Sequence, residues 1–171
     1  MIRLLTGSTH TGKTLLAQRL LERHGAPYLS IDHLKMGLIR SGMCPLTPES
    51  TVEALTAVLW PVVREIVKTA VENGQSLTVE GCYIPFNWRE DFDASCLPHI
   101  RFLCLVFSEA YIRTRFDTIQ THANAIERRK DDSFCTMELL LAENRRNLEA
   151  CRRRGLPYYL IDGPYAPPLD W

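Results

Sequence analysis

The chain has 171 residues, of which 46% are hydrophobic and 23% are charged. This length predicts a single domain over residues 1–171, and the composition is typical of a folded globular protein rather than a disordered or fibrous one. Twenty Lys and Arg residues balance twenty Asp and Glu residues. The balance disfavours proteins that bind nucleic acid or anionic membranes through a strong positive field.

The start of the chain lacks the apolar stretch of a signal peptide, and no run approaches 18 apolar residues, so we expect neither secretion nor a membrane span. The six cysteines are widely separated and include no Cys-x-x-Cys pair, which disfavours a zinc site and a disulfide framework. We therefore expect a cytoplasmic protein in a reducing compartment.

Short apolar runs alternate with longer amphipathic segments, which is the pattern of βα units around a parallel sheet. A first strand is expected at residues 2–6, followed by a loop and a helix at 13–24 that ends at Gly25. A short second strand at 27–31 leads into a segment at 32–40. The fold class indicated is therefore α/β.

A long helix is expected next, with Thr47 as its N-cap, Pro48 in its first turn and its end near residue 72. Pro61 lies inside this helix and is expected to kink it. The predicted buried face consists of Val52, Leu55, Leu59, Val62, Ile66 and Ala70.

The remaining strands are expected at 76–79, 99–107 and 157–161, and the remaining helices after Ser108 and at 136–154. The segment at 83–97 is irregular, with one helical turn expected after Asn87. Apolar residues become sparse and charged residues frequent at 121–133, which indicates an exposed excursion from the domain.

Residues 7–14 read Gly-Ser-Thr-His-Thr-Gly-Lys-Thr, which matches Gly-x-x-x-x-Gly-Lys-[Ser/Thr] in full. The match lies between an expected strand and an expected helix, the context in which this pattern cradles phosphates. Glycines let backbone N–H groups converge on phosphate oxygens, and the helix N-terminus adds a positive dipole end. The residues expected to hold a polyphosphate are Gly7, Ser8, Thr9, His10, Thr11, Gly12, Lys13 and Thr14.

Lys13 and Thr14 have different expected roles in this loop. The Lys13 ammonium supplies a charge for the β- and γ-phosphates, and the Thr14 hydroxyl is a ligand for the Mg²⁺ ion that bridges them. The expected cofactors are therefore ATP and Mg²⁺.

Two carboxylates follow expected strands, Asp32 after the second and Glu80 after the third. Ligands bind beyond the carboxyl ends of the strands in an open parallel sheet, so both are expected near the phosphate-binding loop. Asp32 is the candidate general base and Glu80 the candidate metal ligand, although these two roles can be exchanged. The structural alternatives are a helix N-cap for Asp32 and a solvated strand end for Glu80.

These residues resemble the nucleoside monophosphate kinase-like group of P-loop kinases, which includes adenylate, shikimate, gluconate and zeta-toxin-like kinases. The run Ser-Ile-Asp-His-Leu-Lys at 30–35 is similar to Ser-Thr-Gly-Asp-Met-Leu-Arg of adenylate kinases, and Glu-Gly-Cys-Tyr-Ile-Pro at 80–85 is similar to their Asp-Gly-Phe-Pro-Arg. Arg-Lys-Asp-Asp at 129–132 is similar to the Arg-x-Asp-Asp that follows their lid. The resemblance spans most of the chain.

The resemblance implies a three-layer fold with a five-stranded parallel sheet in the order 2-3-1-4-5, helices on both faces and a small lid at 121–133. It also implies Mg-ATP as the phosphate donor. Arg128 and Arg129 would then close onto the transferring phosphate, and Arg113 and Arg115 would flank the adenine. The alternative for all four arginines is a solvated surface.

The acceptor is less closely defined by this resemblance. The chain lacks the phosphate-binding arginines of adenylate kinases after both strands, while Asp32 is similar to the aspartate of shikimate and gluconate kinases, so a hydroxyl acceptor is favoured over AMP. Residues expected to line a pocket for an anionic small molecule are Asp32, Lys35, Arg40, Tyr83 and Arg89. The alternative for Tyr83 is that it covers the core.

The function expected is an ATP-dependent phosphotransferase acting on a small cytosolic molecule at a hydroxyl group. A nucleoside monophosphate kinase is the alternative within this class, and a non-catalytic nucleotide-binding regulator is the alternative outside it. A GTPase is disfavoured because the chain contains neither Asn-Lys-x-Asp nor Asp-x-x-Gly.

Overall fold

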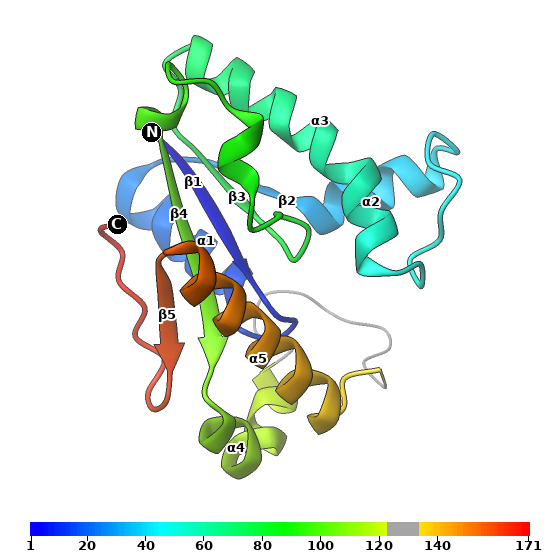
Figure 1. Cartoon of the computed structure of the whole chain (residues 1–171), viewed down its shortest axis with the longest axis vertical. Coiled ribbons are helices and arrows are strands. Elements are labelled where there is room, and N and C mark those ends of the chain that lie inside the picture. Colours follow the sequence, from blue (N-terminus) through cyan, green and yellow to red (C-terminus); the bar gives the residue numbers. More distant parts are fainter. Residues whose placement is uncertain (123–133) are drawn as a thin grey trace.

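The structure is a computed structural model that describes residues 1–122 and 134–171 (Figure 1). All but the first two residues of the expected lid at 121–133 lie outside the described residues, as do Arg128 and Arg129. The strands are β1 (Ile2–Gly7), β2 (Tyr28–Ser30), β3 (Leu77–Glu80), β4 (Ile100–Phe107) and β5 (Tyr158–Ile161). The helices are α1 (Lys13–His24), α2 (Ile31–Arg40), α3 (Val52–Glu72), α4 (Glu109–Thr121) and α5 (Met137–Arg154), with 3-10 helices η1 (Trp88–Asp91) and η2 (Leu97–His99).

The strands form one parallel sheet in the order β2-β3-β1-β4-β5. The α/β fold class and the strand order are therefore confirmed. In the central strand β1, Ile2 is in register with Leu77 of β3 and with Ile100 of β4. Because all strands run in one direction, the carboxyl ends of β1, β2 and β3 meet at one edge, where loops are free to form a ligand site.

Two hydrophobic clusters cover the two faces of the sheet, which is why the central strands are apolar at nearly every position. Successive side chains of a strand point to opposite faces, so Leu4 belongs to one cluster and Leu5 to the other. The first cluster packs α3 and the end of α5 on the sheet, and the second packs α1 and α4. The predicted phosphate-binding loop therefore joins β1, which is buried except at Arg3, to α1, which packs on the sheet.

The long helix α3 begins later than the sequence predicted. Thr47 is not its N-cap, because the Thr47 N–H donates to the Ser50 hydroxyl within a turn that precedes the helix. Thr51 is the N-cap, and its hydroxyl accepts a hydrogen bond from the Ala54 N–H at 3.2 Å. The helix then runs through Pro61 to Glu72.

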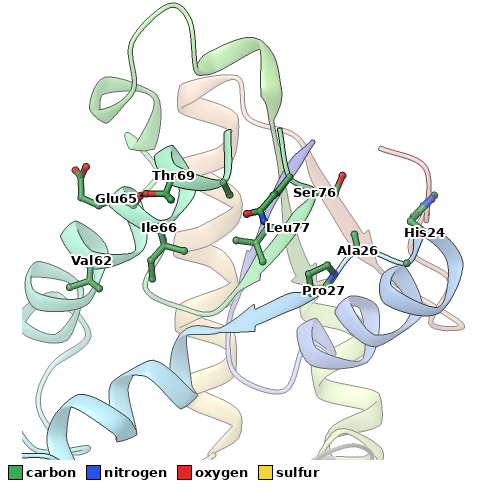
Figure 2. A pocket seen from close by; sticks show the side chains of 12 residues that line it. His24, Ala26, Pro27, Val62, Glu65, Ile66, Thr69, Ser76 and Leu77 are labelled. Carbon is green, nitrogen blue, oxygen red and sulfur yellow. The ribbon is translucent and has the colours of Figure 1, made fainter. Parts of the chain in front are cut away.

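The buried face of α3 also differs from the prediction, at its first residue and in its second half. Val52 and Val62 are 42% and 39% exposed, whereas Val63 and Val67 are fully buried. Val62 and Ile66 instead line an open cavity of about 820 Å³ between the ends of α1 and α3, next to the starts of β2 and β3 (Figure 2).

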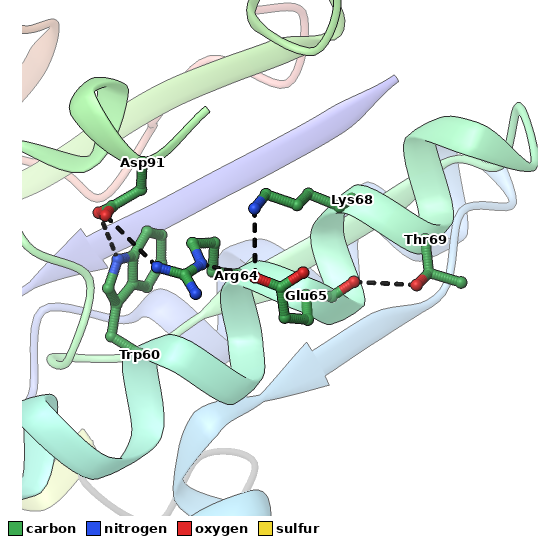
Figure 3. Close-up of polar contacts among 6 residues, drawn as sticks. All are labelled: Trp60, Arg64, Glu65, Lys68, Thr69 and Asp91. Atoms are coloured by element: carbon green, nitrogen blue, oxygen red, sulfur yellow. Dashed lines mark hydrogen bonds and ion pairs between the residues drawn. The ribbon is translucent and has the colours of Figure 1, made fainter. Parts of the chain in front are cut away.

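η1 contacts α3 through Asp91, which lies against Trp60 and Arg64 (Figure 3). The Trp60 indole N–H donates to Asp91 Oδ2 at 2.8 Å, and the Arg64 guanidinium lies 3.6 Å from Asp91 Oδ1. The Trp60 ring also packs edge-on against Phe92, with ring centroids 6.2 Å apart. The segment before β4 therefore covers the side of α3 that carries Trp60 and Arg64.

Two further helices have a side-chain cap. Ser108 and Thr136 accept hydrogen bonds from the N–H groups of Tyr111 and Leu139, and η1 supplies the helical turn expected after Asn87. In the part of the chain that the structure describes, no helix has the length and apolar character needed to cross a membrane.

Asn144 joins α5 to the end of β4. Its side chain is 2% exposed, its Oδ1 atom accepts from the Phe107 N–H at 2.8 Å, and its Nδ2 atom donates to the Leu140 carbonyl at 2.8 Å. We expect Asn144→Ala to lower the free energy of unfolding by about 1–3 kcal/mol, because it leaves a buried N–H without a partner. Urea unfolding measures this loss, and the exposed Glu149→Ala on the same helix should change stability by less than about 0.5 kcal/mol. If Asn144→Ala and Glu149→Ala were equally stable, the two hydrogen bonds of Asn144 would not contribute to stability as described.

Candidate functional site

The loop from β1 to α1 passes very close to neighbouring backbone. A Cβ atom added at Gly7 would lie 2.4 Å from the Leu105 carbonyl oxygen of β4. Gly12 is the N-cap of α1 and has φ 79° and ψ 24°, the left-handed conformation that glycine adopts without strain. A Cβ atom there would also lie 2.8 Å from the ring of Tyr165. Both glycines of the phosphate-binding pattern therefore have steric reasons to be glycine.

Side chains within the loop bond to its own backbone. The Thr11 hydroxyl donates to the Ser8 carbonyl at 2.9 Å, and the Lys13 ammonium donates to the same carbonyl at 2.8 Å. Lys13 is only 8% exposed. The loop thus brings a buried cation to the N-terminus of α1, where the helix dipole also favours anions.

Lys13 keeps its charge because of its acidic neighbours. Burial lowers the pKa of the Lys13 ammonium, but the nearby Cys82, Glu80 and Asp32 together outweigh this and hold the pKa above its ordinary value. Burial in turn raises the pKa of the Cys82 thiol, so this group stays neutral near pH 7 and the carboxylates are the effective counter-charges. Both predicted carboxylates therefore act on Lys13.

Glu80 is the last residue of β3 and is 2% exposed. Its Oε1 atom lies 3.4 Å from the Thr14 hydroxyl. A hydroxyl and a carboxylate form an all-oxygen donor set, which is the set that Mg²⁺ prefers. These two residues therefore fit the metal that the sequence predicts.

Asp32 lies in the first turn of α2 and belongs to a cluster with Lys35 and Tyr83. The N-cap of α2 is Ser30, so the N-cap alternative for Asp32 is wrong. The Lys35 ammonium lies 2.6 Å from Asp32 Oδ1 and 2.9 Å from the Tyr83 hydroxyl. Burial lowers the pKa of Lys35, but Asp32 and Tyr83 outweigh it and raise that pKa. Tyr83, which is 7% exposed, therefore contributes to both the core and this cluster.

Other predicted site residues lie away from this cluster. Arg40 is the exposed last residue of α2. The Arg89 guanidinium lies 5.4 Å from the centroid of the Trp88 ring in η1, and the adjacent Glu90 pairs with Arg154 at the end of α5. The structure therefore does not bring Arg40 and Arg89 together with Asp32.

The two α4 arginines differ in their surroundings. Arg113 pairs with Glu109 at 2.8 Å on the exposed surface of the helix. Arg115 interrupts the helix with φ −128° and ψ 20°, and it lines a cavity of about 400 Å³ next to Pro164. A second cavity of about 360 Å³ lies between the phosphate-binding loop and α4, and the Tyr111 side chain lines both cavities.

Three residues at the site were not identified from the sequence. Glu143 of α5 accepts a hydrogen bond from the Ser8 hydroxyl, and the Tyr165 hydroxyl donates to the Gly12 carbonyl at 2.6 Å. Burial raises the pKa of Tyr165, so its hydroxyl remains a donor. Cys82 adjoins Lys13, and the run Glu-Gly-Cys at 80–82 was the signal that could have identified it.

No protein-family model and no curated protein sequence matches this chain. The structure is similar to that of a gluconokinase from Sinorhizobium meliloti 1021, with 20% identity, a TM-score of 0.53, and coverage of 98% of this chain and 83% of that one. A sugar kinase from Janibacter sp. HTCC2649 has 18% identity and a TM-score of 0.52, with 94% and 84% covered. A deoxyadenosine kinase from M. mycoides has 11% identity and a TM-score of 0.55, with 95% and 90% covered. The resemblance to P-loop small-molecule kinases is therefore confirmed for the fold.

The geometry of Gly12 leads to a direct test. We expect Gly12→Ala to lower the free energy of unfolding by at least about 1 kcal/mol, because alanine is strained at this φ and its Cβ meets Tyr165. Urea unfolding gives this value. Gly163→Ala is the matched control, since a Cβ there meets nothing within 4 Å. If both variants were equally stable, the strained cap would be refuted.

Proposed function

We propose that this protein is an ATP-dependent phosphotransferase that moves the γ-phosphate of Mg-ATP to a hydroxyl group of a small molecule. The observation that carries this proposal is the pair of carboxylates at the carboxyl ends of β2 and β3. Glu80, the last residue of β3, lies 3.4 Å from the Thr14 hydroxyl, and Asp32, which follows β2, acts together with Glu80 on the pKa of Lys13. The similar structures are named as a gluconokinase, a sugar kinase and a deoxyadenosine kinase, which supports the same reaction class. A non-catalytic regulator would not require carboxylates at this position.

The nucleotide side consists of the loop and its flanking cavities. Backbone N–H groups of residues 7–14 and the Lys13 ammonium bind the phosphates, and Thr14 and Glu80 hold Mg²⁺. When bound, Mg²⁺ neutralises charge on the phosphates. The adenine binds in the cavity lined by His10 and Tyr111. Arg115 lines the neighbouring cavity, whereas Arg113 lies on the exposed surface and pairs with Glu109.

The acceptor side depends on Asp32 as general base. Lys35 contacts Asp32 Oδ1, so Oδ2 remains available to accept the proton of the acceptor hydroxyl. The acceptor oxygen forms a bond to the γ-phosphorus, the bond from that phosphorus to the β–γ bridging oxygen breaks, and ADP leaves. Lys35 and Tyr83 act as positioning residues in this scheme. Arg128 and Arg129, by the resemblance to related kinases, stabilise the charge on the transferring phosphate.

The general base is tested by Asp32→Asn, which removes the proton acceptor and keeps the shape of the side chain. We expect turnover to fall by roughly two to four orders of magnitude while the affinity for ATP changes little. Two measurements are needed. The rate of ADP formation is measured with an acceptor that the wild-type protein phosphorylates, and the affinity for ATP is measured by calorimetry. Asp117→Asn, on the exposed surface of α4, is the control. Unchanged turnover in Asp32→Asn would remove Asp32 from the mechanism.

The role of Lys35 is tested by Lys35→Met, which keeps the length of the side chain and removes its charge. We expect kcat to fall by about 10-fold to 100-fold because the base loses its orientation, with the KM for ATP unchanged. Lys35→Arg should restore part of the lost kcat. If Lys35→Met raised only the KM of the acceptor, Lys35 would bind the substrate instead of positioning Asp32.

A further inference from the structure

A cavity of about 460 Å³ lies beside the phosphate-binding loop on the side of the sheet that carries α3 and α5. The first turns of α3, the segment 82–86 after β3 and the middle of α5 form its walls, and Gly7 and Ser8 form the part next to the loop. Lys13 donates to the Ser8 carbonyl and adjoins Cys82, which also lines the cavity. The cavity is therefore next to the place where the Lys13 ammonium meets a terminal phosphate.

The charged residues among the described lining residues are Glu53, Glu143 and Arg146. Arg146 lies 3.8 Å from Glu53, so these two side chains compensate each other across the cavity between α5 and α3. Glu143 accepts a hydrogen bond from the neutral Ser8 hydroxyl. Among the described lining residues, one negative charge therefore has no compensating positive charge. It lies on Glu143, which contacts Ser8 of the phosphate-binding loop.

Cys82 is a lining residue on which the charges of Lys13, Asp32 and Glu143 all act. Burial raises the pKa of its thiol, Lys13 opposes this rise, and the negative charges of Asp32 and Glu143 add to it. Both carboxylates are thus close enough to act on the same lining residue. Glu143 would repel an anionic group placed in this cavity. Asp32 and Glu80 partly compensate the positive charge of Lys13, so its attraction for such a group would be weaker.

The uncharged lining suits a compact molecule with hydroxyl groups. Thr56 and Asn147 offer hydrogen-bond donors and acceptors, while Ile84 and Phe86 offer apolar surface for a hydrocarbon skeleton. An ionised carboxylate only accepts hydrogen bonds, for example from hydroxyl or ammonium groups, because it has no proton to donate. The cavity therefore favours ligands that donate hydrogen bonds over ligands that carry a negative charge.

We infer that this cavity binds the phosphate acceptor with its reacting hydroxyl at Cys82, the lining residue on which Asp32 also acts, and that Glu143 selects hydroxyl compounds that carry no negative charge. The inference rests on the proposed phosphotransferase function and names the substrate class of that site. It places nucleoside monophosphates and sugar acids among the disfavoured acceptors. It also replaces the expectation, drawn from Lys35 and Arg40, of a pocket for an anionic molecule.

The test compares acceptors in matched pairs that differ by one anionic group: glycerol with glycerate, glucitol with gluconate, and adenosine with AMP. ATP-dependent ADP formation gives kcat/KM for each compound, and calorimetry with a non-hydrolysable ATP analogue gives binding. We expect the neutral member of at least one pair to be used or bound at least about tenfold better than its anionic partner.

Glu143→Gln tests the residue itself, because the amide oxygen still accepts from Ser8 while the charge is removed. We expect the preference for the neutral partner to fall by about tenfold, with the KM for ATP unchanged. Glu149→Gln, an exposed residue of the same helix, should keep the wild-type preference.

Each outcome of this test is decisive. Preferential phosphorylation of the anionic partners would overturn the inference and leave the phosphotransferase function standing, as would an unchanged preference in Glu143→Gln. If the protein bound ATP but neither used nor bound any of these compounds, the inference would also be overturned. Failure to bind ATP at all would overturn the proposed function itself.

Discussion

The buried ammonium group of Lys13 organises the ends of three strands. A cation that is 8% exposed is costly to bury unless opposite charges and hydrogen-bond acceptors surround it. The Ser8 carbonyl from the loop after β1, Asp32 from the start of α2 and Glu80 from β3 meet this requirement. The sheet order brings these elements together because β1 lies beside β3, and β3 beside β2. The same groups that stabilise the lysine are those a phosphoryl transfer requires.

The sequence was informative where a structural feature depends on neighbouring residues. The predicted phosphate-binding loop, the cap at Ser108 and the turn after Asn87 are local, and each has a steric or hydrogen-bonding rule that fixes its residue types. Asp32 and Glu80 were found by adding one topological rule to this local information, namely that ligands bind at the carboxyl ends of parallel strands. Their proximity to Lys13 follows from that rule.

The features that the sequence did not reveal depend on long-range packing. Ser8 and Glu143 are 135 residues apart, and Gly12 and Tyr165 are 153 residues apart, so no spacing pattern links them. Val63 of α3 is buried where helical periodicity alone favoured Val62, and Trp60 on the same helix bonds to Asp91, 31 residues further along the chain. Arg89 follows Glu80 closely in the chain, but its guanidinium lies over the Trp88 ring in η1. Closeness in sequence is therefore a poor guide to the acceptor side of the site.

The central claim is that the loop at 7–14 binds a triphosphate through Lys13, and calorimetric titration with Mg-ATP tests it most directly. We expect the wild-type protein to bind Mg-ATP and Lys13→Met, which keeps the fold as judged by urea unfolding, to bind it at least about 30-fold more weakly, because a charged hydrogen bond to phosphate is lost. Absence of binding by the wild-type protein, or equal binding by a folded Lys13→Met variant, would contradict this account.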